Sequence, residues 1–365
     1  DLGNLESDLQ AGALTGYRLL WLLLWSHLVG LTYQILAARL GVATGRSLAE
    51  HLRASYPKRS LGILWGFIEL ALMGADAQLV IGNAIAIQVL FGAPLWLGVA
   101  VTALNVPLLS LMSQLGRAGN GQRGKRMEWC FAGAIGVMAG CFFWVMLLSK
   151  PDLKALLAGL FVPDVPKKAR MQAVGLFGAT VMPHNIILHS ALVNSGGVAA
   201  CRQAIVREVA FYLSLESCVT LFISFLINCA ILISFACNFS SSKKHGADAK
   251  SLPGLYEGAG VLEAAIGPLG PLLWGCGLLA AGQSATITVT MAGQHVLEGF
   301  WRRSVSAGRR IAATRAVSFL PALLVACLWP KHMDMLGEWF NVLQSICLPV
   351  ALVPLLRFTN ARSVM

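Results

Sequence analysis

Residues 179–185 read Ala-Thr-Val-Met-Pro-His-Asn and lie inside a long apolar run, residues 173–193. Proline has no amide hydrogen, so Pro183 removes the helical bond to the carbonyl of Ala179, four residues earlier. In lipid, unpaired backbone groups cost several kcal/mol unless a cavity, water or an ion satisfies them. The stretch therefore predicts a helix interrupted inside a membrane, where the Ala179 carbonyl and the Met182 thioether are available to a ligand.

The chain has the composition of a membrane protein. Of its 365 residues, 56% are hydrophobic and 12% are charged, about half the charged fraction of an average soluble domain. A helix needs about 20 apolar residues to cross a bilayer, and the pattern predicts ten spans. After a short first run that ends near Gly16, they cover approximately Leu19–Leu40, Leu61–Leu90, Pro94–Leu115, Trp129–Leu148, Ala173–Val193, Tyr212–Phe235, Gly260–Val289, Ile311–Trp329 and Trp339–Phe358.

The net charge of +11 indicates membrane topology rather than nucleic-acid binding. The basic residues occupy connectors between apolar runs, and alternate threading places most of them on one side, which the positive-inside rule makes cytoplasmic. We therefore expect an integral membrane protein of the plasma membrane or an endosomal or vacuolar membrane. The sequence starts without methionine, and we expect both ends to be truncated, with the N-terminus cytoplasmic.

The nine cysteines are spread singly through mostly apolar sequence, without a CxxC pair. This predicts buried thiols that pack as small hydrophobic groups, rather than a zinc site or a disulfide framework. The motifs HExxH and GxSxG and paired catalytic carboxylates do not occur. The sequence therefore favours a protein that is not an enzyme and carries no cofactor.

A second interruption opens the sequence. Asp1-Leu2-Gly3-Asn4 begins the first run, and residues 182–185 interrupt the sixth, five spans later. An odd number of spans per half predicts that the second half is inverted, and inverted repeats with interrupted first helices place a substrate site at the membrane midplane. We expect one transmembrane domain, residues 1–365, with repeats at approximately 1–150 and 170–360.

The two interruptions together offer three oxygens and one sulfur. Asp1 and Asn4 would contribute a carboxylate and an amide oxygen to the Ala179 carbonyl and the Met182 thioether. Structural alternatives exist for each side chain. Asp1 or Asn4 could cap a helix, and methionine commonly fills gaps in a core.

Five stretches resemble signatures of the natural resistance-associated macrophage protein (NRAMP) family of divalent metal transporters. DLGNLESDLQAGA (1–13) resembles the signature of the first helix, whose usual form is DPGN, and GATVMPHNIILHSALV (178–193) resembles that of the sixth. The third, eighth and tenth helices are similar to ELALMGADAQLVIGNAIAI (69–87), LLAAGQSATITVTMAGQ (278–294) and NVLQSICLP (341–349).

The resemblance implies an all-α polytopic membrane protein with a LeuT-type bundle of two inverted five-helix repeats, here running from the middle of helix 1 to helix 10. It implies proton-coupled secondary transport of Mn²⁺ or Fe²⁺ by alternating access, with the ion as cargo. The expected partners are divalent metal ions, protons and the bilayer, without nucleic acid. The implied metal-binding groups are Asp1, Asn4, the Ala179 carbonyl, Met182 and, in some states, Gln344.

Ionisable residues inside the predicted spans suggest a proton route. Glu69 and Asp76 lie two helical turns apart on one face of the third span, and such groups usually mark a pathway or an ion pair. Arg315, in the ninth run, is the natural partner. The resemblance places Asp76, Arg315 and His184 along the family's proton route. Glu69 is also explained as a residue near the cytoplasmic end of its span, and His184 as a hydrogen-bond donor to a freed carbonyl.

Three positions depart from the family pattern. Leu2 replaces the proline of DPGN, Leu79 stands where a glutamate commonly follows three residues after Asp76, and Asn105 stands where many relatives have an aspartate. These changes preserve the metal ligands and weaken the case for tight proton coupling. A membrane metal sensor of the same fold that does not transport remains the alternative. A sodium-coupled amino-acid symporter is disfavoured because the Met182 thioether is a poor sodium ligand.

Overall fold

A computed structural model of the chain describes residues 1–102, 122–194, 203–242, 253–301, 307–329, 333–361 and 364, with the side chains of 122–128, 194, 203–204, 240–242 and 307–316 left out. The described residues form helices and contain no strand. The elements are α1 (Leu2–Thr15), α2 (Leu20–Thr44), α3 (Leu48–Ser55), α4 (Lys58–Phe91), α6 (Gln122–Leu148), α7 (Leu153–Phe161), the 3₁₀ turn η1 (Lys167–Ala169), α8 (Arg170–Thr180), α9 (Pro183–Asn194), α10 (Gln203–Ser242), α11 (Glu257–Ile266), α12 (Leu269–Trp301), α13 (Ala307–Leu328), α14 (Met333–Cys347) and α15 (Pro349–Asn360).

Seven helical stretches in the described part of the chain are long and apolar enough to cross a membrane. They lie at Leu20–Thr44, Lys58–Phe91, Trp129–Leu148, Lys167–Val193, Ile205–Phe239, Leu269–Trp301 and Met333–Asn360. The first and ninth predicted runs correspond to α1 and α13. The fourth run begins with helical residues 95–102, and the rest of it, with Asn105, lies outside the described residues. The polytopic all-helical fold is thus confirmed.

Two predicted spans are interrupted in the structure. The span predicted over 260–289 is present but lies at Leu269–Trp301, because Gly267 adopts a φ of 75° and separates α11 from α12, a conformation that glycine accepts without steric cost. The span over 339–358 changes helix at Pro349, which starts α15 and cannot donate a helical hydrogen bond. Sequence periodicity missed both breaks because apolar residues continue across them.

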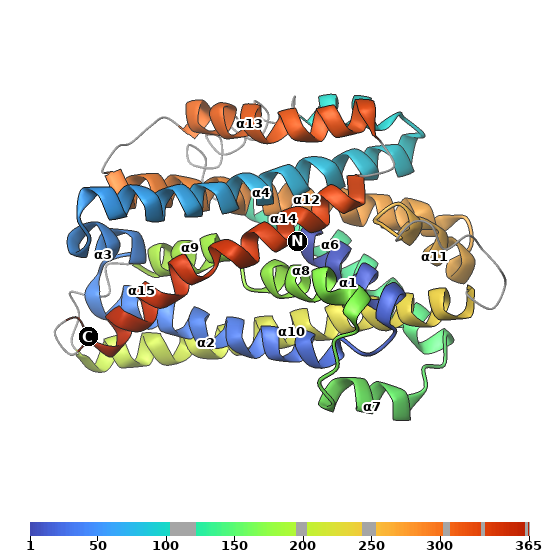
Figure 1. The fold of residues 1–365 in the computed structure, drawn as a ribbon, viewed down its shortest axis with the longest axis horizontal. Coiled ribbons are helices and arrows are strands. Elements are labelled where there is room, and N and C mark those ends of the chain that lie inside the picture. The colour runs from blue at the N-terminus through green and yellow to red at the C-terminus, as the bar shows by residue number, and fades with distance from the viewer. Residues whose placement is uncertain are drawn as a thin grey trace.

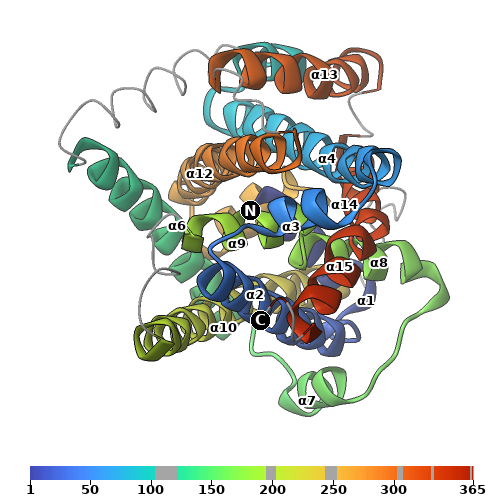
Figure 2. The ribbon, with the colours of Figure 1, turned by 90° about the vertical axis from the view of Figure 1, so that its left-hand side faces the viewer.

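The two halves of the sequence interleave around the short helices (Figure 1). α4 packs against α12 and α14, whereas α10 packs against α1 and α2. Along the helix axes, α9 and the N-terminus lie centrally, with α4 and α12 on one side and α2 and α10 on the other (Figure 2). The α1–α10 contact depends on Gly12, where a Cβ atom would collide with the Leu232 carbonyl. α9 and the N-terminus therefore lie between two pairs of longer helices.

The connector between α2 and α4 contains the short helix α3, which begins with a capping box. The Glu50 amide donates to Ser47 Oγ at 3.3 Å, and the Ser47 amide donates to Glu50 Oε2 at 2.8 Å. His51 is buried, with its Nε2 2.9 Å from Thr44 Oγ1. Burial, reinforced by the Arg46 charge and opposed by Glu50, lowers the pKa of His51. These contacts fix α3 against the end of α2.

The expectation that the cysteines are buried is correct only in part. The eight cysteines that the structure describes are free thiols, and Cys347 is fully buried. Cys130, Cys276 and Cys327 are exposed, so the prediction is wrong for these three. They lie on the exposed faces of the apolar helices α6, α12 and α13, where a small apolar thiol is tolerated without burial. Cys201 lies outside the described residues.

Candidate metal site

The sequence ATVMPHN interrupts a helix, as predicted. α8 ends at Thr180, Val181 and Met182 form the link, and α9 starts at Pro183. The last amide of the first segment, that of Val181, donates to the Phe177 carbonyl at 3.0 Å. Because Pro183 has no amide hydrogen, the Ala179 carbonyl has no donor four residues ahead. The break therefore leaves this carbonyl available where the two segments meet.

The second pair of candidate ligands lies at the start of α1. Asp1 occupies the N-cap position, but its side chain makes no capping hydrogen bond, and its carbonyl accepts from the Leu5 amide at 3.2 Å. Asn4 Oδ1 is buried and has no hydrogen-bond partner among the described residues. The capping alternative is therefore not observed for the Asp1 side chain. A buried amide oxygen without a donor is costly, so Asn4 has an acceptor to offer.

Both breaks open into one cavity of about 170 Å³. Its walls include the four predicted ligands Asp1, Asn4, Ala179 and Met182. At about 30 Å³ per water, the volume suits an ion with a few remaining waters. The other lining residues are His27, Gly30 and Gln34 of α2, Thr180 and Val181 of the break, Asn185 and Ile186 of α9, and Leu221 and Ser224 of α10.

Met182 is held in place by a neighbour that the sequence did not single out as a partner. Its side chain is 6% exposed, and Asn185 Nδ2 donates to its sulfur at 3.3 Å. A thioether sulfur has a second lone pair for another contact. Asn185 therefore orients the sulfur as outer-shell hydrogen bonds orient metal ligands.

Gln344, the fifth predicted ligand, does not line the cavity. Its Nε2 donates to Gln78 Oε1 on α4 at 2.8 Å, and its own Oε1 is buried without a partner among the described residues. The structure thus shows a state in which Gln344 is bound to α4. Its amide oxygen is the acceptor that remains for a ligand.

A buried hydrogen-bond network surrounds Gln78 and connects three helices. Gln78 Nε2 donates to Asn341 Oδ1 at 2.6 Å and to the Gly337 carbonyl at 2.9 Å, both on α14. Asn341 Nδ2 donates to the Gly3 carbonyl at 3.2 Å and to Ser7 Oγ at 2.8 Å, both on α1. The network therefore anchors the start of α1, beside Asp1 and Asn4, to α4 and α14.

Sequence reasoning missed the wall of the cavity that α2 and α10 provide. His27 and Gln34 are seven residues apart in a mostly apolar span, so they share one face of α2. Gln34 Nε2 donates to Ser217 Oγ of α10 at 3.3 Å. The spacing of His27 and Gln34 was the feature of the sequence that could have identified α2 as a wall of the cavity.

The proton-route candidates lie on helices that pack together, although the structure does not test their role. Asp76 and His184 are 4% and 1% exposed, on α4 and α9, which are in contact. His184 Nδ1 has no hydrogen-bond partner in the described chain. Glu69 is half-buried on α4. Arg315 belongs to α13, which contacts α4, but its side chain lies outside the described set.

Two departures from the family pattern have a clear place in the fold. Leu2 is 1% exposed and lies so close to Gly82 of α4 that a Cβ atom there would collide with it. Leu79 is fully buried. Both residues are thus part of the apolar packing of α4.

Within the described residues, no group of three or more His, Cys, Asp or Glu side chains could hold a metal ion, so the candidate site depends on mixed donors.

Comparison with known proteins agrees with this geometry. The family model "Natural resistance-associated macrophage protein-like" matches residues 1–365. The chain is 44% identical over 373 residues to the metal transporter Nramp2 of Populus trichocarpa, covering all of this chain and 67% of that protein. It is 42% identical over 367 residues to the metal transporter nramp1 homolog of Dictyostelium discoideum, covering all of this chain and 66% of that protein.

The fold is similar to that of a solved transporter. The crystal structure of the Eremococcus coleocola manganese transporter, in complex with an aromatic bis-isothiourea substituted compound, superposes with a TM-score of 0.83 at 28% identity. The match covers all of this chain and 77% of that one. The LeuT-type architecture that the resemblance implied is therefore confirmed. From its sequence over the full length and from its fold, the chain belongs to the Nramp family.

Proposed function

We propose that the chain is a secondary transporter of divalent transition-metal ions of the Mn²⁺ and Fe²⁺ class. The observation that carries the proposal is the single cavity lined by Asp1, Asn4, Ala179 and Met182. It lies where two helix ends meet inside a bundle of membrane spans. The names of the relatives, metal transporters and a manganese transporter, support the same substrate class.

The donor set explains how such an ion would be selected. Ca²⁺ and Mg²⁺ are hard ions that prefer oxygen ligands, whereas Mn²⁺ and Fe²⁺ also accept softer donors. Asp1 supplies the negative charge, Asn4 and the Ala179 carbonyl supply neutral oxygens, and Met182 supplies the soft donor. The thioether thus favours transition metals over the more abundant alkaline-earth ions.

Gln344 would join the ion in another state of the transport cycle. In the present state its Nε2 is bound to Gln78 of α4 and it does not line the cavity, so we assign its contact with the ion to a state in which α14 has moved relative to α1. Alternating access in inverted-repeat transporters is largely such a movement of one group of helices against another. We therefore assign to Gln344 the step that links ion binding to a change in the α1–α14 contact.

Proton coupling forms the second part of the proposal. Asp76 and His184 are buried on neighbouring helices, and Ser318 Oγ of α13 donates to the Met73 carbonyl of α4 at 3.2 Å. Arg315 lies three residues before Ser318 on α13, the helix that this hydrogen bond joins to α4. Protons would pass along Asp76, His184 and Arg315, with Glu69 at one end. The route operates without a carboxylate at Leu79.

Uptake measurements test both parts. The full-length protein is reconstituted in liposomes, and Mn²⁺ uptake is followed with and without an inward proton gradient. We expect uptake that the gradient accelerates, that Asp1→Asn abolishes, and that becomes insensitive to the gradient in Asp76→Asn. Saturable Mn²⁺ binding without uptake would indicate the non-transporting sensor instead. Uptake that ignores the gradient in the unmodified protein would refute the proton route alone.

A further inference from the structure

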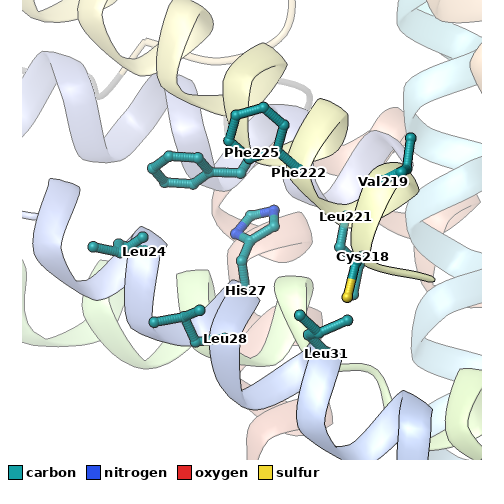
Figure 3. A pocket seen from close by; sticks show the side chains of 9 residues that line it. All are labelled: Leu24, His27, Leu28, Leu31, Cys218, Val219, Leu221, Phe222 and Phe225. Carbon is teal, nitrogen blue, oxygen red and sulfur yellow. The ribbon is translucent and has the colours of Figure 1, made fainter. Parts of the chain in front are cut away.

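A second cavity lies between α2 and α10, beside the metal cavity. Its volume is about 410 Å³, within the range of about 300–1,000 Å³ typical of ligand-binding pockets. Figure 3 shows the aliphatic and aromatic side chains of the two helices facing one another around His27. The lining residues are Leu24, His27, Leu28 and Leu31 of α2 and Cys218, Val219, Leu221, Phe222 and Phe225 of α10. We call this cavity the α2–α10 groove.

His27 is the one strongly polar side chain in the groove lining, and both of its ring nitrogens are engaged by the protein. Nδ1 lies 2.9 Å from the Leu23 carbonyl, which can only accept, so Nδ1 carries the hydrogen. Nε2, 3.4 Å from Asn228 Nδ2, therefore accepts from that amide. The ring also makes an edge contact with Phe225, with centroids 5.5 Å apart. No ring nitrogen is left for a ligand, so the groove suits an apolar occupant.

The groove is continuous with the surface that faces lipid. It lies within two membrane-spanning stretches, Leu20–Thr44 and Ile205–Phe239. At its rim, Leu28, Val219 and Phe222 are 43%, 52% and 61% exposed. An apolar cavity of this kind does not hold water, whereas the hydrocarbon chains of the bilayer meet its opening directly. The adjoining lipid interface therefore identifies the occupant as hydrocarbon.

The groove shares a wall with the metal cavity. His27 and Leu221 line both cavities, with the metal ligands on one side and the groove on the other. A side chain with an unfilled space on one side loses its packing contacts there. A molecule bound in the groove would therefore hold His27 and Leu221 more firmly against the metal cavity.

We propose that an acyl chain of a bilayer phospholipid occupies the α2–α10 groove and, through His27 and Leu221, sets the metal affinity of the neighbouring cavity. The effect on metal affinity rests on the proposed function, whereas the occupancy of the groove by lipid is independent of it. The groove is thus a lipid-binding site through which the bilayer regulates the transporter.

Occupancy is tested by photochemical crosslinking of the full-length protein in nanodiscs. The probe is phosphatidylcholine with a diazirine near the end of one acyl chain, and crosslinked peptides are identified by mass spectrometry. We expect crosslinks concentrated on the groove faces of α2 and α10. Val219→Trp should remove them, because the indole fills the groove. Ile223→Trp is the matched control, since Ile223 lies on the same helix, is 51% exposed and does not line the groove.

Leu28→Trp, on the opposite side of the groove, is a second blocking variant should Val219→Trp fail to fold. Crosslinks spread evenly over the exposed faces of both helices would overturn the lipid site. Crosslinks that persist in both blocking variants would do the same. Neither result depends on metal transport.

Regulation is tested by calorimetric titration of Mn²⁺ into the purified protein in detergent, with and without added phosphatidylcholine. We expect the unmodified protein to bind Mn²⁺ about fivefold or more tightly when the lipid is present, the lower range of typical coupling between two sites. Val219→Trp should bind equally with and without the lipid, because its indole already fills the groove, whereas Ile223→Trp should respond to the lipid as the unmodified protein does. The same response to lipid in the two variants would overturn the proposed effect on metal affinity. Groove crosslinks in a protein that binds no Mn²⁺ would refute the proposed function while supporting the lipid site.

Discussion

The replacement Gln78→Leu tests the buried network that anchors the first helix break. Gln78 is 3% exposed and contacts three groups on α14, namely the Gly337 carbonyl, Asn341 Oδ1 and Gln344 Nε2. Leucine is close to glutamine in volume and keeps the helix, but it can neither donate nor accept. The substitution therefore removes the polar contacts with little change in packing.

The size of the effect follows from the groups left behind. Gly337 lies inside a helix, so its carbonyl can keep a helical hydrogen bond. Asn341 Oδ1 and Gln344 Nε2, on fully buried side chains, each lose a partner, and a buried unsatisfied group costs about 1–3 kcal/mol. The two sum to about 2–6 kcal/mol. We expect about 3 kcal/mol, because side-chain rotation would recover part of the loss.

The assay is unfolding of the purified protein by sodium dodecyl sulfate in mixed micelles, followed by circular dichroism. Gln88→Leu is the matched control, since Gln88 lies on the same helix, is half-buried and makes no side-chain hydrogen bond to a described residue. We expect Gln78→Leu to lose about 3 kcal/mol and the control less than about 0.5 kcal/mol. Equal losses in the two variants would refute the reasoning that the network anchors α1.

Three further predictions concern the connectors and the core. Ser47→Ala should cost about 1 kcal/mol, because it removes the acceptor of the Glu50 amide at the start of α3; an unchanged thermal midpoint would contradict this. The pKa of His51 is lowered in the folded protein, so the unfolded chain takes up a proton at this position first as the pH falls. The folded state is therefore fully stable with respect to His51 above the unfolded-state pKa of about 6.5, and it loses stability as the pH falls from there toward the native pKa. His51→Gln should therefore reduce the drop in melting temperature between neutral and mildly acidic pH, and an undiminished drop would argue against it. Trp274→Ala should cost about 3–5 kcal/mol in detergent unfolding, because this side chain is fully buried and its removal leaves a cavity. A loss below about 1 kcal/mol would contradict this prediction, since it would mean that neighbouring side chains fill the space.

Much of the fold could be predicted because lipid imposes strict rules on a sequence. A span must be apolar over a fixed length, and an interruption inside it must have a chemical reason. Pro183 supplied that reason, and the break between Thr180 and Pro183 was correctly placed. Apolar continuity misled the prediction at Gly267 and Pro349, where the hydrophobic pattern does not register a change of helix.

The candidate site could be predicted only in part. Asp1, Asn4, Ala179 and Met182 belong to two local motifs, so their meeting followed from the expected repeat. The contributions of α2 and α10 depend on contacts between distant segments, which no local pattern specifies. Gln344 illustrates a further limit, because its partner, Gln78 or an ion, depends on the conformational state. The proton route stays a prediction, as do the inverted repeats at approximately 1–150 and 170–360.

The account rests on a partly soft metal site formed where two helix breaks meet. The most direct test is Ca²⁺ competition with Mn²⁺ uptake in liposomes that contain the full-length Met182→Ala protein. Met171→Ala serves as the control, because Met171 is half-buried on α8 and does not line the cavity. We predict that Met182→Ala still takes up Mn²⁺ while Ca²⁺ competes about tenfold better, a difference of about 1.4 kcal/mol. Identical ion selectivity in the two variants would contradict the assignment of Met182 as a ligand.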